Sequence, residues 1–271
     1  MKLPELPEVQ TIVDDLNKEI LGCRIIGITT ITGSIWRRRC PPGRKIIHAT
    51  VTGIGRKGKH IFMHLSNGRI LIVHLGMTGQ LKKDRSNIRP GKHTHLIIEF
   101  EKFDLHYDDV RRFGFLDLVN SGDLDNVSYL SKLGPDPLEI DEEKFVDLIK
   151  SKKRMLKPLL LDQSVISGLG NIYSDEALFR AGINPKANSR KLRKIRIVGL
   201  YRAMREILES AIMARGSSIS DYVDSSGGKG GYQDYHAVYG RTGEPCRNCG
   251  ARIKREIIGG RSAHFCPRCQ R

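Results

Sequence analysis

The stretch LLLDQSVISGLGNIYSDEALFRAGINP, residues 159–185, decides how the second half of this chain folds. Gly168 and Gly170 separate two apolar helical segments, and the second helix is predicted to begin near Ser174. A helix, a glycine turn and a second helix leave free backbone N–H groups at a helix start, which suit a phosphate of nucleic acid. Many glycine turns only connect two helices, so other segments have to decide whether this turn binds a phosphate or is a simple connection.

The charge of the chain favours a polyanionic partner. Its 271 residues contain 46 Lys and Arg against 30 Asp and Glu, which gives a formal net charge of +16. Nucleic acid is the first candidate, an anionic membrane surface is the second, and a merely well-solvated surface is the alternative. No apolar run approaches the roughly 20 residues that cross a bilayer, so we expect a soluble, cytoplasmic protein of two domains that share an interface.

Four of the six cysteines form two closely spaced pairs near the end of the chain. Their spacing is x2 within each pair and 16 residues between the pairs: Cys246, Cys249, Cys266 and Cys269. This pattern predicts one structural Zn²⁺ held tetrahedrally by four thiolates. Two disulfides in a secreted protein are the alternative, which the lack of a signal sequence disfavours. We expect Cys23 and Cys40 to pack as small apolar groups.

The first half of the chain reads as one helix followed by a β-sandwich. Residues 8–21 place apolar side chains at i, i+3 and i+4, which predicts an amphipathic helix. Short β-branched runs then alternate with Gly, Asn and Pro turns from Arg24 to Val119, and they predict seven or eight strands. The clearest runs are RIIGITTI, KIIHATVTGI, HIFMHL, RILIVHL, HLIIEF and FGFLDLV.

Helical periodicity replaces the strand pattern in the second half. It covers residues 129–215, and we expect the domain boundary between 120 and 130. Residues 216–234 are rich in Gly and Ser and predict a mobile loop that leads into the cysteine segment. The expected organisation is α+β, with a sandwich over 1–125, a helical domain over 126–235 and a zinc finger over 236–271.

Two loops of the predicted sandwich carry side chains suited to a distorted duplex. The stretch LIVHLGMTGQL contains His74 and Met77, and HYDDVRRFGF contains Arg111 and Phe113. A flexible apolar side chain, a cation and an aromatic ring can fill the gap left when a base is pulled out of DNA. We therefore expect Met77, Arg111 and Phe113 together on loops that face a cleft between the domains. Taken singly, each is more often a core or a solvated residue.

The chain resembles the formamidopyrimidine-DNA glycosylases, bacterial enzymes of base-excision repair. The segments that carry the resemblance follow the family's order along nearly the whole chain: PELPEV, GKH, HLGMTG, RRFG, LDQSVISGLGNIYSDEALFRAGINP, VYGRTGEPC and FCPRCQ. The related endonuclease VIII typically opens with Pro-Glu-Gly-Pro-Glu, so a glycosylase for pyrimidine lesions is the weaker alternative.

The resemblance implies a fold and a reaction. The fold would be a β-sandwich with a terminal helix, then a helix-two-turns-helix domain closed by a β-hairpin zinc finger. Pro4 would be the amine nucleophile, Glu5 the acid that protonates the sugar or relays protons, and Glu8 a support of the same pocket. Lys59 and Arg261 would assist the β- and δ-eliminations and hold phosphates. Glu8 can also be explained as an acid that complements the helix dipole.

The resemblance also implies how the partner is held. The partner would be double-stranded DNA with an oxidised base or an abasic site, bound by a monomer. Its phosphates and bases would meet side chains from both domains: His74, Met77, His93, Arg111, Phe113, Lys153 and Asn171. Residues 216–231 match the segment that covers an everted oxidised purine in this family, so 8-oxoguanine and formamidopyrimidines are the expected lesions.

The start of the chain departs from the family pattern. Met1, Lys2 and Leu3 precede Pro4, and a proline nitrogen inside a peptide bond is a planar amide without a usable lone pair. Three explanations are open. Translation could start at Leu3 with later removal of methionine, or a protease could trim the first three residues. Alternatively, the chain could bind damaged DNA without cutting it.

Overall fold

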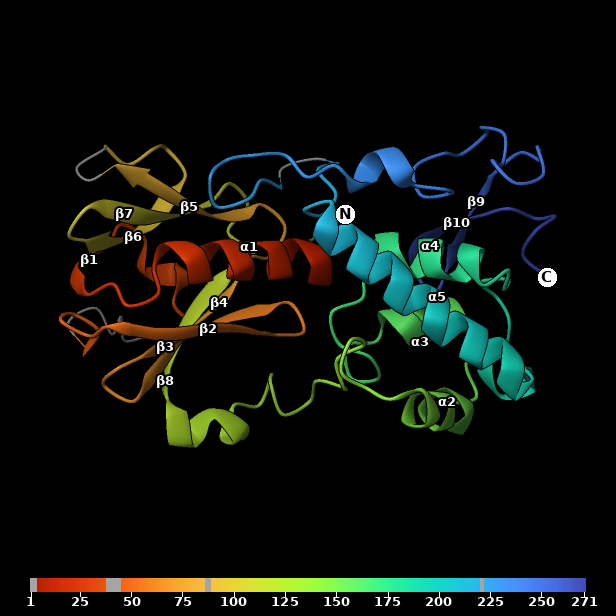
Figure 1. Cartoon of the computed structure of the whole chain (residues 1–271), viewed down its shortest axis with the longest axis horizontal. Helices are drawn as coiled ribbons and strands as arrows, with labels where there is room; N and C mark the ends of the chain where they lie inside the picture. The colour runs from red at the N-terminus through yellow and green to blue at the C-terminus, as the bar shows by residue number, and fades with distance from the viewer. Residues whose placement is uncertain (1–3, 38–44, 86–88, 220–221) are drawn as a thin grey trace. The chain divides into compact units, whose positions relative to one another are not determined.

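The computed structural model describes residues 4–37, 45–85, 89–219 and 222–271. Its chain forms two compact units (Figure 1). The amino-terminal unit contains the chain up to Ser131 together with Arg215–Gly231, and the carboxy-terminal unit contains Lys132–Ala214 and Tyr232–Arg271. Met1, Lys2, Leu3 and Cys40 lie outside the described residues.

Where the amino-terminal unit is described, it consists of two antiparallel sheets and one α-helix (Figure 1). Helix α1 spans Leu6–Glu19, and the short 3-10 helices η1 and η3 span Gly33–Ile35 and Ser121–Asn126. One sheet has the order β1-β6-β7-β5 and the other the order β2-β3-β4-β8. The strands are β1 Ile25–Thr30, β2 Val51–Lys57, β3 His60–Leu65, β4 Arg69–His74, β5 Gly79–Arg85, β6 Thr94–Phe100, β7 Phe103–Asp109 and β8 Phe115–Asn120.

The core of this unit lies between the sheets and the apolar face of α1. Val9, Ile12, Val13 and Leu16 are at most 3% exposed, as the helical spacing predicts. They share one cluster with the inward side chains of the strands. Burying each such side chain stabilises the fold by about 1.5–3 kcal/mol, so the opening helix is fixed firmly against the sandwich.

The strand prediction holds in outline and differs at three places. The described residues of the sandwich form eight strands, but β5 and β7 are absent from the apolar runs because they are rich in Lys and Asp. The side chains of Asp104, His106 and Asp109 are nevertheless buried in β7, where hydrophobic periodicity gives no signal. Residues 45–50 form no strand, since a turn with His48 at φ 67° occupies them and β2 begins at Val51.

Four helices and a β-hairpin make up the carboxy-terminal unit. They are α2 Glu142–Ser151, α3 Leu156–Leu161, α4 Asn171–Arg180, α5 Lys194–Met213, β9 Lys254–Ile258 and β10 Arg261–Phe265, with the 3-10 helices η4 Ser189–Lys191 and η5 Tyr232–Tyr235. Helix α5 packs on both α2 and α4. Helix α4 starts at Asn171, three residues before the predicted start near Ser174, because Gly170 takes an extended conformation as its N-cap. In the described part of the chain no helix is both long and apolar enough to cross a membrane.

The division into units differs from the expected domain boundaries. The first boundary falls at Ser131 instead of 125, and Arg215–Gly231 returns to the amino-terminal unit instead of staying with the helices. Tyr222 from this return segment is 8% exposed and joins the sandwich core. The segment looks like a loose linker in sequence because Gly and Ser carry no periodic pattern, whereas one inserted ring and several hydrogen bonds fix its described residues.

Candidate functional site

The start of α1 gathers two buried carboxylates. Glu5 is the N-cap residue and Glu8 lies one turn later, and their exposed fractions are 3% and 1%. The Glu8 Oε2 atom accepts the backbone N–H of Glu5 at 2.8 Å, which is the reach-back bond of a capping box. The other oxygen, Oε1, accepts the backbone N–H of Ser217 at 2.7 Å. Glu8 is thus a helix cap and a tie to the return segment, next to the buried Pro4.

A second group of side chains lies where β3 begins and β4 ends. Lys59 occupies the turn between β2 and β3, and His60 and His74 are cross-strand partners with ring centroids 4.8 Å apart. The His74 ring also stacks on Phe115 at 5.2 Å. Burial lowers the pKa of His60 to about 4 and that of His74 to about 3. Both imidazoles are therefore neutral near pH 7.

Hydrogen bonding fixes the tautomer of His74. The backbone N–H of Gly76 donates to its Nδ1 atom at 3.1 Å, so Nδ1 is an acceptor. The single proton of the neutral ring must then be on Nε2. His74 consequently offers an uncharged N–H donor beside the Lys59 turn, a combination that suits a phosphate oxygen.

The loops that carry Met77, Arg111 and Phe113 lie side by side. The Arg111 guanidinium sits 4.8 Å from the centroid of the Phe113 ring, and that ring is 53% exposed. Met77 lies in the turn after β4, is only 7% exposed and is not part of the sandwich core cluster. Its turn is pressed against the second loop, since a side chain at Gly76 would collide with the backbone of Phe113 and Gly114.

A buried aspartate that the sequence reading missed organises both loops. Asp109 is fully buried and accepts hydrogen bonds from the backbone N–H of Gly114 at 2.8 Å and of Arg111 at 3.2 Å. It also accepts from the hydroxyl of Thr78 in the neighbouring turn. Its own N–H donates to the carbonyl of His93, which is half-buried in the turn before β6. The sequence does carry one indication of this role: Asp109 ends a strand just before VRRFG, where an Asp side chain commonly accepts backbone N–H groups of the following turn.

In the carboxy-terminal unit, side chains hold the glycine turn before α4. Gly168 has φ 89°, a region that favours glycine, and its N–H donates to Oε1 of Gln163 at 2.9 Å. The Nε2 group of Gln163 donates to the carbonyl of Leu169 at 2.8 Å. Asn171 begins the helix with a half-buried side chain, and its buried Oδ1 has no hydrogen-bond partner among the described residues. The turn thus presents a helix start and an unused polar atom.

A buried lysine, also missed by the sequence reading, ties this turn to the hairpin. Lys157 is fully buried, and its Nζ donates to the carbonyl of Asn171 at 3.0 Å and to Asp175 Oδ1 at 2.6 Å. The second oxygen of Asp175 accepts the backbone N–H of His264 at 2.9 Å, and it lies 3.0 Å from that residue's Nδ1. Helices α3 and α4 and strand β10 therefore share one buried ionic network. Its only sequence signal is a lysine before Pro158 in an apolar run.

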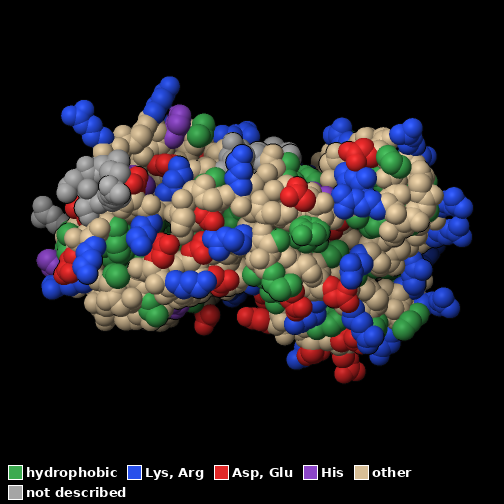
Figure 2. All heavy atoms as spheres, turned by 45° about the horizontal axis from the view of Figure 1, so that its top comes forward, with side chains coloured by type: hydrophobic (Ala, Val, Ile, Leu, Met, Phe, Trp, Pro, Cys, Tyr) green, Lys and Arg blue, Asp and Glu red, His purple; other side chains and the backbone are tan. Residues whose placement is uncertain are grey.

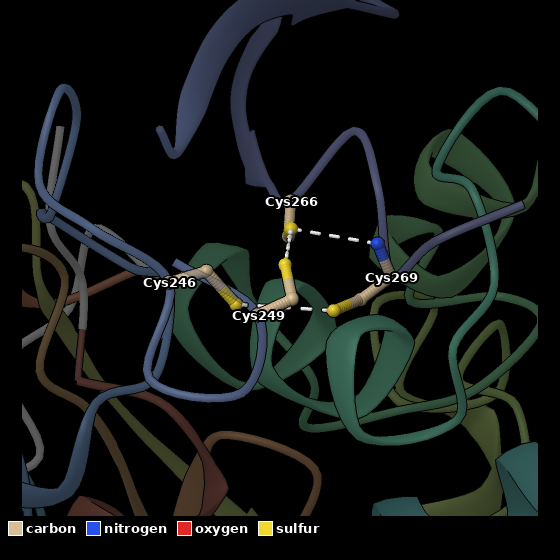
Figure 3. A group of neighbouring side chains, drawn as sticks. All are labelled: Cys246, Cys249, Cys266 and Cys269. Atoms are coloured by element: carbon tan, nitrogen blue, oxygen red, sulfur yellow. Dashed lines mark hydrogen bonds between the residues drawn. The ribbon is translucent and has the colours of Figure 1, made fainter. Parts of the chain in front are cut away.

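The four predicted zinc ligands converge on one point (Figure 3). Their sulfur atoms all lie within 4.8 Å of one another, with 3.9 Å between Cys246 and Cys269 and 3.4 Å between Cys249 and Cys266. Sulfurs bound to one tetrahedral Zn²⁺ at about 2.3 Å are about 3.8 Å apart, so the arrangement fits this ion. All four thiols are free, which excludes the disulfide alternative.

The zinc hairpin presents Arg261 at its tip. Gly259 and Gly260 form the turn with φ of 58° and 75°, and the exposed Arg261 follows as the first residue of β10. Lys153 lies exposed between α2 and α3. More generally, Lys and Arg side chains are spread over both units on the face shown in Figure 2, with fewer acidic ones between them.

Three family models match successive parts of the chain. They describe the formamidopyrimidine-DNA glycosylase N-terminal domain over residues 3–116, the H2TH domain of the same enzymes over 133–223, and the zinc finger found in FPG and IleRS over 243–271. The chain belongs to the formamidopyrimidine-DNA glycosylase family. The glycosylase resemblance inferred from the sequence motifs is confirmed, and the matched finger together with the four close sulfurs assigns one structural zinc to this family member.

Relatives of known name match the chain from end to end. The formamidopyrimidine-DNA glycosylase of Solibacter usitatus is 44% identical, with 99% of this chain and all of the relative covered. That of Bacillus subtilis is 38% identical, with 99% of each chain covered. A crystal structure of a Lactococcus lactis FPG mutant with Fapy-dG DNA matches with a TM-score of 0.93, 36% identity and coverage of 99% and 100%. One of the Lactococcus lactis protein with abasic-site DNA matches with a TM-score of 0.92, 36% identity and coverage of 98% and 99%.

Proposed function

We propose that this chain is a bifunctional DNA-repair enzyme that excises oxidised purines from duplex DNA and then cuts the strand at the resulting abasic site. The full-length match to structures that contain Fapy-dG DNA or abasic-site DNA carries this proposal. The basic surface, the phosphate-suited groups of both units and the zinc finger support it. Because the substrate is chromosomal DNA and the relatives are bacterial, we place its action at the nucleoid.

The reagent in the proposed reaction is the nitrogen of Pro4 as a free secondary amine. It attacks C1′ of the damaged nucleoside, and the bond to the base breaks as the base leaves with a proton. Loss of the ring oxygen from C1′ then gives an iminium ion between Pro4 and the opened sugar. The iminium acidifies the C2′ proton, so the 3′ phosphate leaves by β-elimination and the 5′ phosphate follows by δ-elimination.

The buried carboxylates would serve this reaction unequally. We assign to Glu5 the proton transfer to the sugar oxygen, since it adjoins Pro4 at the helix start. Glu8 already accepts two backbone N–H groups, so we assign it a supporting role that fixes Glu5 and the return segment. Their negative charge would stabilise the developing iminium cation.

The phosphates flanking the lesion would be held by groups of different character. Lys59 and the neutral N–H donor of His74 come from the sandwich, and Asn171 and Arg261 come from the glycine turn and the hairpin. Lys59 and Arg261 would also assist the two eliminations. His93, Arg111 and Lys153 would add contacts that increase affinity without sequence preference. Arg111, Phe113 and Met77 would fill the gap and support the orphaned partner base.

The decisive experiment concerns the peptide bond between Leu3 and Pro4. A chain that starts Met-Pro4 exposes the amine once methionine is removed, and it should cut abasic DNA and be trapped on it by borohydride. Protein whose intact Met1 is verified by mass should do neither, because its Pro4 nitrogen is an amide. If both forms cut at equal rates, Pro4 is not the nucleophile and Lys59 becomes the candidate.

The acylated Pro4 also favours a second candidate function. A chain that keeps Met1, Lys2 and Leu3 would bind damaged DNA without covalent chemistry. Such a protein gives a reversible, salt-sensitive shift with lesion duplex and no borohydride-trapped complex. Sequencing the first residue of the protein from its native source decides between the two functions.

A further inference from the structure

The return segment, Arg215–Gly231, follows α5 and belongs to the amino-terminal unit, where hydrogen bonds join its two ends. In Figure 1 its described residues form the light-blue stretch that runs above α1 in the view. The Ser218 hydroxyl donates to the carbonyl of Tyr222 at 2.8 Å and accepts the N–H of Gly230 at 2.9 Å, so both ends of the segment meet. Gly230 has no room for a side chain against the backbone oxygens of Arg215 and Gly216, which requires glycine there.

Arg215 fastens the return segment through two carboxylates. Its Nη2 atom lies 2.7 Å from Asp15 Oδ2 on α1 and 2.6 Å from Asp224 Oδ2 in the segment itself, and its Nε lies 3.1 Å from the same Asp224 oxygen. Asp15 and Asp224 are 7% and 6% exposed. Without the guanidinium the two buried carboxylates would face each other with no positive charge between them, which is unfavourable. We call these three residues the Arg215 clamp.

The clamp is connected to the edge of the sandwich. The other Asp224 oxygen accepts the N–H groups of Ser226 and Gly228, which closes a tight turn. The next residue, Ser225, accepts the N–H of Lys83 with its carbonyl at 3.0 Å. Since Lys83 belongs to the edge strand β5, the segment is fixed to the helix and to the sheet at once.

Only one residue separates Arg215 from Ser217, whose N–H binds the Glu8 carboxylate. Arg215 itself has φ 61°, a left-handed conformation that is costly for a residue with a side chain. The ion pairs of its guanidinium hold that conformation. They aim the following backbone at Glu8, where the distance from Ser217 N to Oε1 is 2.7 Å. A shift at the clamp would thus move the segment relative to the Glu5–Glu8 end of α1.

We propose that the Arg215 clamp is a positioning device for base excision. It sets where Ser217 and the other described residues of the return segment lie at the start of α1, so the rate of purine removal depends on it. Cleavage at an abasic site depends on it much less, because such a site has no base to be placed and Glu8 keeps its bond to the Glu5 N–H without the clamp. This inference rests on the proposed function and deepens it by separating the two half-reactions, with Arg215, Asp15 and Asp224 as positioning residues.

The test compares both half-reactions in chains that start Met-Pro4. In Arg215→Gln and Asp15→Asn, single-turnover excision of 8-oxoguanine from a duplex should slow about tenfold, since the coupling between residues in direct contact is on the order of 1.4 kcal/mol. Cutting of a preformed abasic site should stay within about twofold. The double variant should be no slower than the worse single one, because both remove the same interaction.

Arg202→Gln is the matched control, because it removes one positive charge from an ion pair with Glu142 at 3.1 Å in the other unit. It should leave the ratio of the two rates unchanged, and Arg215→Lys should recover part of the excision rate. If Arg215→Gln loses excision and abasic-site cutting equally, or loses neither, the proposed role of the Arg215 clamp is wrong. A parent chain that neither excises 8-oxoguanine nor cuts abasic DNA instead overturns the proposed function.

Discussion

At the scale of single residues, neighbours decide which chemistry a side chain offers. His60 and His74 lie opposite each other with Lys59 and Arg37 close by, and burial and these cations keep both rings neutral. The Arg37 guanidinium covers the rings of Phe115 and Tyr129 at 4.7 and 4.3 Å, and the Phe115 ring stacks on that of His74. A neutral His74 can donate its Nε2 proton to a phosphate over a wide pH range.

The lowered pKa values predict a loss of stability in mild acid. The unfolded chain binds a proton at His60 below pH 6.5, whereas the folded chain does so only near pH 4, so the free energy of unfolding must fall as pH drops through this window. His60 alone accounts for on the order of 1 kcal/mol by pH 5.5. In His60→Phe, the free energy of unfolding measured with urea should differ between pH 7 and pH 5.5 by about 1 kcal/mol less than it does in the parent chain.

His64→Phe is the control for this experiment. His64 is exposed on the same strand, so this variant controls for the loss of an imidazole from β3 that is not buried. An unchanged pH dependence in His60→Phe would show that His60 is not held neutral by the fold.

Arg261 gives a second prediction at this scale. Its guanidinium is exposed at the hairpin turn, where it can make paired hydrogen bonds to a phosphate. Arg261→Ala should weaken binding to lesion duplex about tenfold, the equivalent of one charge-assisted contact, without loss of zinc or helix content. Binding is measured by fluorescence anisotropy at fixed salt. The control is Arg268→Ala, which removes another exposed arginine of the same finger and should weaken binding less. If Arg261→Ala binds lesion duplex as tightly as the parent chain, Arg261 does not bind a phosphate.

At the scale of elements, buried and half-buried polar residues hold the loops from inside. Asp109 fixes the loop of Arg111 and Phe113, Gln163 fixes the glycine turn, and Lys157 joins that turn to β10. Each of these residues satisfies backbone or ionic groups that would otherwise be buried unpaired. Exposed side chains such as Phe113 can therefore act from a rigid support.

A wedge at Phe113 should matter most where a base pair has to be opened. Phe113→Ala should slow excision of a paired lesion about tenfold, since unstacking costs a few kcal/mol, and should affect a single-stranded lesion much less. Val110→Ala removes another exposed apolar side chain from the same loop and should spare both substrates. A uniform loss on paired and single-stranded DNA would assign Phe113 to folding instead.

The sequence predicts the elements of this fold better than their connections. Strong periodicity located α1 and α5, and cysteine spacing located the zinc ligands, because both signals are local. The return of residues 215–231 to the first unit was not predictable, because it depends on contacts between residues far apart in the sequence. Arg215 pairs with Asp15, which lies 200 positions earlier, and Tyr222 bonds to the carbonyl of Glu8, 214 positions earlier. The buried position of Met77 likewise depends on packing between two loops.

At the scale of the whole molecule, the zinc finger is joined to α4 by an acidic pair. Asp175 binds His264 of the hairpin, and Glu176 accepts the backbone N–H groups of residues 237–239 before the first zinc ligand. Phe179 of the same helix packs with Val238 and two of the cysteines. The helix that starts at the glycine turn is therefore also the support of the finger.

Removal of zinc tests this connection and the metal assignment together. Zinc-dependent folding of a four-cysteine site is worth on the order of 10 kcal/mol, more than the small cluster around Phe179 can supply, so a chelator should unfold the finger. Metal analysis should find one zinc per chain before treatment. Hydrogen exchange should then show lost protection in β9 and β10 and retained protection in β3 and β4, with affinity for lesion duplex lost and regained on adding zinc. Zinc well below one per chain, disulfides among the four cysteines, or a hairpin that stays protected after chelation would each contradict a finger held by its metal.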